Sequence, residues 1–342
     1  MHTKSLTIFF SYSKWEGKTV RAQEVEVGNA IGRLLCNPVF QTSGKKLLAK
    51  GHQISEEDIR LLGVEGHKQV WVALLEDGEI PEEEAAFKLA TEAACGSMEI
   101  RMSAGGRANL FATEDCCLLL DEAVLREVNL TGCVTIATMP NLAFGMAGQR
   151  LASVKTAPFG VPGTDLDKAL RLVTTQGPIL QARPIRNATV AVLYSDPLQG
   201  ERARRLFEGI MKTRLDRVAT SAAFVLVAKE EETAVARALD HLIRARPTVL
   251  LIASTTAPAG PEDVVGQAMK RVGCRIERFL APVEPGNLLL LAYAGETPVV
   301  AAPGCFRSPK SNVVDLILPP LLARYPLSAS EISSLGHGGL LL

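Results

Sequence analysis

The fold class of this chain is decided by the stretch Glu296-Thr-Pro-Val-Val-Ala-Ala-Pro-Gly-Cys-Phe-Arg-Ser-Pro-Lys-Ser-Asn312 and the apolar residues that follow it. Its short apolar run, residues 299–302, is typical of a strand buried in a parallel sheet. Pro303 and Gly304 end that strand with a turn. Apolar side chains then recur every three or four residues over 314–322, which predicts an amphipathic helix. The stretch therefore predicts a strand, a loop and a helix in that order.

The loop between this strand and this helix carries two cations and two hydroxyl groups. Arg307 and Lys310 alternate with Ser308 and Ser311 just before the helix begins. The first turn of a helix has free N–H groups and a partial positive charge, so it attracts anions. Two cations and two hydroxyls beside it predict a phosphate site. Ser308, Ser311 and Asn312 are available to cap the helix. The alternative to a phosphate site is an ordinary solvated loop that happens to be basic.

The same alternation of strands and helices extends upstream to residue 187. We expect apolar strands over 189–194, 222–228, 248–253, 275–280, 288–292 and 299–302, and helices over 201–215, 230–245 and 261–272 before the last one. Such alternation indicates a parallel sheet covered on both faces. The fold class is therefore α/β, with a three-layer α/β/α C-terminal domain and a mostly parallel sheet.

Residues 1–185 have a less regular pattern, which predicts a mixed α+β region of one or two subdomains. We expect a helix over 27–35, a capping box at Ser55-Glu-Glu-Asp58 and a helix over 82–95. Gly105 and Gly106 form either a substrate loop with Arg107 or a turn that needs glycine. Prolines then break the pattern, so we place the domains at 1–185 and 186–327, with a C-terminal tail at 328–342.

Three loops follow strands of the predicted sheet and are expected to meet at its carboxyl edge, where α/β folds bind ligands. Hydroxyls, carboxylates and a basic loop around one rim suit a small phosphorylated heterocycle. Asp263 either caps the helix it precedes or contacts a heterocycle or a metal. No histidine lies in these loops, which excludes a Ser-His-Asp triad. The candidate residues are Ser195 and Asp196; Thr255, Thr256, Gly260 and Asp263; and residues 303–312.

Composition excludes several classes of protein. The formal net charge of zero argues against general nucleic-acid binding, which needs a basic surface. No apolar run approaches the roughly 20 residues of a membrane span. The N-terminus lacks the pattern of a signal peptide, and the seven cysteines contain no Cys-x-x-Cys pair. We therefore expect a cytoplasmic protein with reduced thiols, which contacts neither nucleic acid nor membrane.

Specific motifs carry a family resemblance over nearly the whole chain. Residues 303–312 match the pattern Pro-Gly-Cys-x-Arg-Ser-Pro-Lys-x-Asn in full, and Gly-Arg-Ala-Asn-Leu stands at 106–110. Ala-Ser-Val-Lys-Thr-Ala-Pro-Phe-Gly-Val-Pro at 152–162 approximates a third motif. The chain thereby resembles bacterial molybdopterin-binding proteins that are often fused to a MobA-like nucleotidyltransferase. Residues 190–325 resemble their MoaB/Mog-like molybdopterin-binding domain.

The chain departs from the related molybdopterin molybdenumtransferases at two places. Their Ser-Gly-Gly-x-Ser-x-Gly-x-x-Asp motif is matched at Gly260 and Asp263, but Thr255 and Thr256 replace its central glycines. Their Lys-Pro-Gly-Lys-Pro segment corresponds to residues 284–288, where neither lysine is kept. The resemblance therefore implies binding more strongly than catalysis.

The resemblance implies a protein that binds molybdopterin or the molybdenum cofactor and acts in its biosynthesis, modification or delivery to a molybdoenzyme. The terminal phosphate would lie against Arg307, Ser308 and Lys310. The backbone of Pro303, Gly304 and Cys305 would allow its close approach. The pterin, the dithiolene or a metal would contact Thr255, Thr256 and Asp263, with Ser195 and Asp196 opposite.

Two other functions stay open. One is a molybdopterin molybdenumtransferase that inserts molybdate into adenylated molybdopterin, with Mg²⁺ and with Asp263 as a catalytic residue. The other is a non-catalytic scaffold for a nucleotidyltransferase or a molybdenum hydroxylase. The basic loop could lower the pKa of Cys305, but the sequence places no base beside it, which favours a packing or backbone role over a reactive thiol. A homodimer is implied by the resemblance alone.

Overall fold

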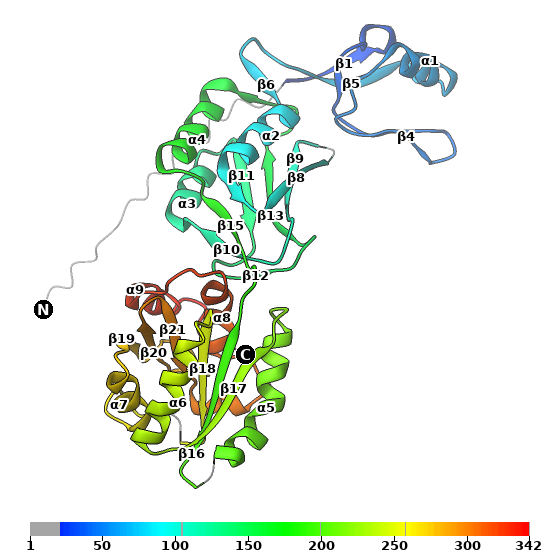
Figure 1. The fold of residues 1–342 in the computed structure, drawn as a ribbon. Coiled ribbons are helices and arrows are strands. Elements are labelled where there is room, and N and C mark those ends of the chain that lie inside the picture. The colour runs from blue at the N-terminus through cyan, green and yellow to red at the C-terminus, as the bar shows by residue number, and fades with distance from the viewer. Residues whose placement is uncertain (1–20, 104, 199, 257, 342) are drawn as a thin grey trace, which may run out of the picture.

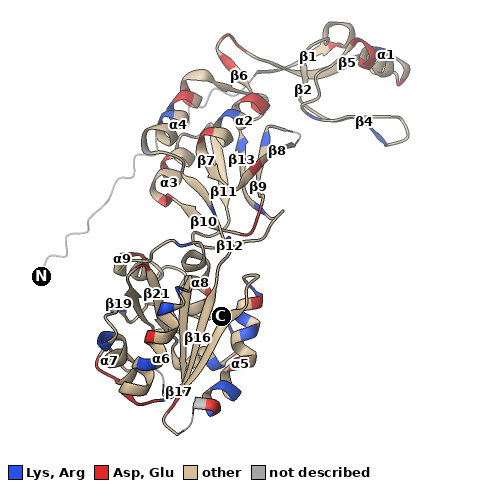
Figure 2. Cartoon of the chain, in the orientation of Figure 1, with Lys and Arg blue, Asp and Glu red and all other residues tan. Residues whose placement is uncertain are grey.

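A computed structural model describes residues 21–341 apart from 104, 199 and 257. The chain passes through three successive parts, coloured blue, cyan to green, and green to red (Figure 1). The lack of signal-peptide features concerns residues 1–20, which lie outside the described residues. Basic and acidic positions alternate along the ribbon of all three parts (Figure 2), in keeping with the balanced charge of the sequence.

The first part is a small antiparallel unit with its own apolar cluster. The capping box is confirmed, because Ser55 accepts a hydrogen bond from the Asp58 N–H and Asp58 accepts one from the Ser55 N–H. The helix predicted over 27–35 is wrong, since Gly32 takes a φ of +76° and the chain turns there into a strand. Its elements are β1 (Arg21–Glu26), η1 (Val27–Asn29), β2 (Leu34–Leu35), β3 (Val39–Phe40), β4 (Lys46–Leu48), α1 (Glu56–Val64) and β5 (Gln69–Leu74).

The second part packs helices against one of two four-stranded sheets, ordered β11-β13-β9-β8 and β12-β10-β15-β7. The predicted helix over 82–95 is present, with its acidic first turn. The strands are β6 (Glu79–Pro81), β7 (Ala94–Gly96), β8 (Met98–Ser103), β9 (Arg107–Ala112), β10 (Cys116–Leu120), β11 (Val134–Thr138), β12 (Phe144–Gly145), β13 (Arg150–Thr156), β14 (Gly160–Pro162) and β15 (Leu180–Pro184). The helices are α2 (Glu82–Ala93), α3 (Glu122–Leu130) and α4 (Gly163–Gln176).

The third part is built on a six-stranded sheet. Its strands, in order across the sheet, are β17 (Ala222–Lys229), β16 (Val190–Asp196), β18 (Val249–Ser254), β21 (Thr297–Ala301), β20 (Leu290–Ala294) and β19 (Arg275–Phe279). The first four are parallel to one another, whereas β20 is antiparallel to both of its neighbours. The sheet is therefore mostly parallel, as predicted, and β20 is the exception because Gly295 and Glu296 join it to β21 by a tight turn.

Helices cover both faces of this sheet, as Figure 1 shows for α5 on one side and α6 and α7 on the other. One face packs on α5 (Gly200–Asp216) and α8 (Val313–Leu322), and the other on α6 (Glu232–Arg244) and α7 (Val264–Arg271). The chain is therefore an α/β protein with three layers in this part. After residue 327, α9 (Ala329–Ser334) buries Ile332 in the same core. The domain boundary near residue 185 stays a prediction.

The helices of the described residues are too short or too polar to cross a bilayer.

Candidate functional site

The loops after β16 and β18 meet at the carboxyl edge of the sheet. These strands are parallel neighbours, with Ser195 opposite Ser254 in register. The Thr255 hydroxyl donates to Asp196 Oδ2 at 2.6 Å, and the Thr255 N–H donates to the Ser195 carbonyl at 3.1 Å. The structure thus brings the first two predicted loops together, where ligands bind in open α/β sheets.

Asp196 is a buried charge that organises this edge. Its side chain has no exposed surface and accepts from Arg202 Nη1 at 2.8 Å and from the Leu198 N–H at 2.9 Å, besides Thr255. A carboxylate that is fully covered cannot line an open cavity, but it can hold other groups in place. The structure therefore assigns Asp196 a positioning role at the edge.

Glu230 is a candidate site residue that the sequence pattern did not predict. It follows β17, the next parallel strand, and accepts hydrogen bonds from Ser254 Oγ and Thr256 Oγ1. Residue 230 was assigned to the start of a helix, whereas α6 begins at Glu232. The order of the strands could have predicted this position. Glu230 directly follows a strand that is parallel to its neighbour, and parallel strands end at the same edge of the sheet.

Ser195 lies beneath this cluster. It is fully buried, and its Oγ has no hydrogen-bond partner among the described residues. Its neighbour in register, Ser254, does have partners in Glu230 and Thr256. Of the polar residues at this edge, Glu230 and Thr255 are half-buried and Thr256 is exposed, so these three can meet a ligand.

Asp263 caps a helix, as one of the two alternatives predicted. Its Oδ1 accepts from the Gly266 N–H at 2.7 Å, and its Oδ2 from the Ala259 and Gly260 N–H groups at 2.6 and 3.2 Å. The helix begins at Val264 rather than at residue 261. Three backbone donors use much of the acceptor capacity of this carboxylate. Its catalytic role stays a prediction without geometric support.

The third loop, residues 303–312, folds around the buried Arg214 of α5. Arg214 Nη2 donates to the carbonyls of Ser308 and Lys310 at 2.7 and 3.0 Å, and Nη1 forms an ion pair with Asp315. The same guanidinium lies 4.8 Å from the centroid of the buried Phe306 ring. The cation that organises the loop is therefore 94 residues away from Ser308 in the sequence.

The first turn of α8 is already occupied by its own side chains. Asn312 Oδ1 accepts from the Val314 N–H at 2.9 Å, and Asp315 Oδ2 accepts from the Asn312 N–H at 2.8 Å. The predicted capping by Asn312 is confirmed. Because the Asp315 carboxylate holds the place where an anion would bind, this helix start does not by itself provide a phosphate site.

Arg307 and Lys310 are exposed, and within the described part of the chain their side chains form no ion pair or hydrogen bond. The Ser308 hydroxyl accepts from the Lys310 N–H at 3.2 Å. Pro303 is buried, while Gly304 is half-buried. In this part of the chain, no side-chain hydrogen bond joins residues 303–312 to the loops at Asp196 and Thr255. The third loop follows β21, a parallel neighbour of β18, so it begins at the same edge of the sheet, but its hydrogen bonds go to Arg214 of α5.

Cys305 is half-buried beside Phe306, and burial raises the pKa of its thiol. The charge of Glu284 raises this pKa further, and Arg214 lowers it by less. A raised pKa disfavours a thiolate at this position, so the packing role is favoured over a thiol activated by the basic loop.

We expect Cys305 to be alkylated by iodoacetamide more slowly than the same residue in the urea-unfolded chain. A raised pKa means less thiolate at a given pH, so the difference should be largest near pH 8 and shrink as the pH rises. Peptide mass spectrometry of timed samples measures the rate. Faster alkylation in the folded protein at pH 8 would restore the activated thiol.

The described residues contain no group of three or more His, Cys, Asp or Glu side chains arranged to hold a metal ion. Asp196, Glu230 and Asp263 instead accept hydrogen bonds from protein donors. The donor set at this edge therefore does not fit a Mg²⁺ site.

Comparison with known proteins gives only weak structural similarities. No family profile and no curated protein matches the chain. A molybdopterin biosynthesis MoeA protein from Pyrococcus horikosii is similar in structure over 92% of this chain and 77% of that one, at 10% identity and a TM-score of 0.32. A molybdenum cofactor biosynthesis protein from Pyrococcus furiosus is similar over 89% and 64%, at 11% identity and a TM-score of 0.22. At such TM-scores neither likeness carries an argument about function.

Proposed function

We propose that this protein binds a phosphorylated pterin of the molybdopterin class at the carboxyl edge of its α/β sheet, and acts in the biosynthesis, modification or delivery of the molybdenum cofactor. The observation that carries this proposal is the hydrogen bond from Thr255 to Asp196 at 2.6 Å, which joins two loops into one polar rim. The motif resemblance of residues 303–312 supports the choice of ligand.

The rim offers groups suited to the edge of a pterin. Thr255 and Thr256 supply hydroxyls, and Glu230 supplies a carboxylate that can accept hydrogen bonds from ring N–H groups. Ser195 and Asp196 are fully buried, so neither can contact a ligand directly in this structure. Both would instead hold the residues of the rim in place. Asp263 and Gly260 hold the second loop in shape through the helix cap.

The phosphate end of the ligand would be held by residues 303–310. Arg214, rather than Arg307 or Lys310, neutralises Asp315, so the two exposed cations stay available for an anion. A phosphate accepts charge-assisted hydrogen bonds from arginine, lysine and hydroxyl donors. The residues in this role are Pro303, Gly304, Cys305, Arg307, Ser308 and Lys310.

The decisive measurement is whether the purified protein carries or takes up molybdopterin, detected by the fluorescence of the released and oxidised pterin. We expect Arg307→Ala to weaken binding by about 1.5–3 kcal/mol, the range for a hydrogen bond to a charged group. Arg205→Ala, which removes an exposed arginine from α5, should leave binding unchanged.

Unchanged binding in Arg307→Ala would refute the phosphate role of this loop. Protein that carries no pterin and binds none when supplied would refute the proposal and favour the scaffold alternative. Release of AMP from adenylated molybdopterin, with molybdate and Mg²⁺ present, would assign the transferase activity instead.

A further inference from the structure

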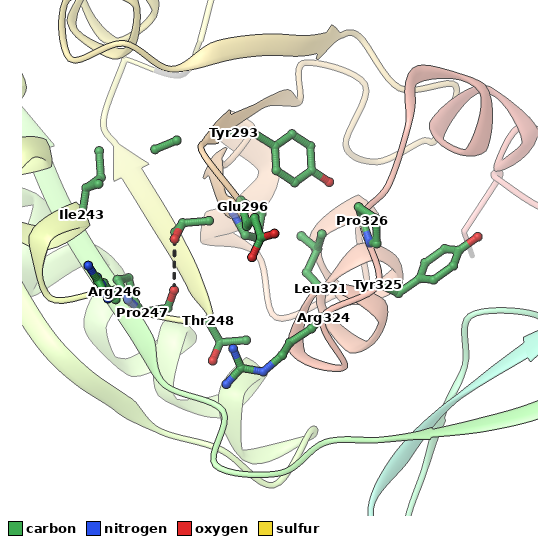
Figure 3. Close-up of a pocket in the computed structure, with 13 residues that line it drawn as sticks. Ile243, Arg246, Pro247, Thr248, Tyr293, Glu296, Leu321, Arg324, Tyr325 and Pro326 are labelled. Carbon is green, nitrogen blue, oxygen red and sulfur yellow. Dashed lines mark hydrogen bonds between the residues drawn. The ribbon is translucent and has the colours of Figure 1, made fainter. Parts of the chain in front are cut away.

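A cavity of about 520 Å³ lies at the amino edge of the same sheet, opposite the rim described above. It is bounded by the end of α6, the start of β18, the turn between β20 and β21, and the end of α8 (Figure 3). Its size falls within the roughly 300–1,000 Å³ of small-molecule sites. This edge is not the one where the resemblance places a ligand.

Two arginines line the cavity, Arg246 after α6 and Arg324 after α8. Both are exposed, and within the described residues neither guanidinium forms an ion pair or a hydrogen bond. Figure 3 shows Arg324 extending from the end of α8 in the direction of Thr248. Two unpaired guanidinium groups on one cavity favour an anionic ligand, and a phosphate in particular.

The two helix ends do not themselves require these arginines. Each arginine follows a helix in a left-handed conformation, at φ of +50° for Arg246 and +56° for Arg324, where glycine is usual. Backbone N–H groups already satisfy the last carbonyls, from Arg246 to Ile243 and from Arg324 to Leu321. An arginine here costs backbone energy without capping the helix through its side chain. Binding of an anionic ligand would explain why an arginine stands at each of these two positions.

The remaining walls are apolar and aromatic. Ile243, Leu321 and three prolines line the cavity together with Tyr293 and Tyr325. The Tyr293 hydroxyl is bonded to the backbone of Leu327, so this residue presents its ring rather than a free hydroxyl. An aromatic wall beside two cations suits an anion that carries a flat ring.

Glu296 is the acid that lines the cavity, and it is exposed. It can accept a hydrogen bond from a ring N–H or an amino group, but it repels a phosphate. The cavity therefore selects a ligand with its phosphate near the arginines and its hydrogen-bond donors near the turn.

We propose that this cavity binds a phosphate monoester of an aromatic heterocycle, of the size of a nucleoside monophosphate, with Arg246 and Arg324 holding the phosphate. This site is separate from the rim and goes beyond the proposed function. It gives the protein a second small-molecule site on the opposite edge of one sheet.

The test is equilibrium dialysis of the full chain with AMP, adenosine and inorganic phosphate at low salt. We expect saturable binding of AMP, with weaker binding of adenosine and of phosphate alone. Arg246→Gln and Arg324→Gln should each weaken AMP binding roughly tenfold or more, because each removes a charge-assisted bond.

Arg244→Gln is the matched control, since Arg244 lies on α6, pairs with Asp240 and does not line the cavity. Equal weakening in this control would reduce the effect to general electrostatics and overturn the proposal, as would AMP that does not bind saturably at millimolar concentration. AMP binding that is lost in Thr255→Val but kept in both arginine variants would place it at the rim instead. Matching circular dichroism spectra show that the variants are folded.

Discussion

Replacing Arg214 with methionine is expected to destabilise the third part of the protein by about 3–5 kcal/mol, the cost of breaking a buried ion pair. The Arg214 side chain is 2% exposed, and its partner Asp315 is 16% exposed. Arg214→Met leaves Asp315 without its buried counter-ion. It also leaves the carbonyls of Ser308 and Lys310 without a donor, which adds the cost of unsatisfied polar groups.

Arg217→Met is the control for this change. Arg217 pairs with the same carboxylate at 3.4 Å, but it is 42% exposed, so water screens the interaction. Its loss should cost no more than about 1 kcal/mol. Similar costs for the two variants would show that Arg214 is not the organising residue of the loop.

The measurement has to report on the third part of the chain. Trp15 and Trp71, the only tryptophans, both precede the predicted boundary, so their fluorescence reports elsewhere. Urea unfolding followed by amide hydrogen exchange over residues 303–322 gives a local free energy. We expect Arg214→Met to remove most of the protection of this segment and Arg217→Met to leave it.

The sheet of the third part could be predicted because buried parallel strands have short, continuous apolar sequences. Each predicted strand from residue 189 onward has a counterpart, from β16 to β21. The direction of β20 could not be predicted in this way, since an apolar run does not encode its orientation. The dipeptide Gly295-Glu296, between the predicted strands at 288–292 and 299–302, is the local signal for a hairpin.

The candidate site was predictable where topology determines it. Parallel neighbours end at the same edge, so the meeting of the loops at Asp196 and Thr255 follows from strand order. The prediction for the third loop used only the charges within it, whereas the conformation of this loop depends on the charge of the distant Arg214. Arg214 lies in a predicted amphipathic helix, where an arginine is common. No spacing in the sequence indicates that its side chain contacts residues 303–312.

Asp315 also shows why the local charges alone gave an incomplete prediction, in this case from a residue close by in the sequence. The spacing from Asn312 to Asp315 is a capping-box pattern, with the acid at the position that fills the helix start. Considered only with the two basic residues before it, that helix start is a site for phosphate. Considered with Asp315, it is already neutralised, and only Arg307 and Lys310 extend beyond it.

Asp196→Asn is expected to weaken pterin binding by about 10–100-fold, although Asp196 itself touches no ligand in the proposed arrangement. An asparagine of the same shape loses the charge that pairs with Arg202. Its NH₂ group cannot accept a hydrogen bond, so either Thr255 or another donor loses its acceptor. Losing one such bond to a charged group costs about 1.5–3 kcal/mol, which corresponds to roughly this range of affinity if the loop must be reordered on binding.

A double-mutant cycle with Thr255→Val tests whether Asp196 acts through Thr255. Both single variants should weaken pterin binding, and the double variant should lose little more than the worse of the two, because both remove the same 2.6 Å bond. Thr255→Ser, which keeps the hydroxyl, should restore binding. Additive losses would mean that Asp196 and Thr255 contribute independently, and the positioning role of Asp196 would then have to be given up.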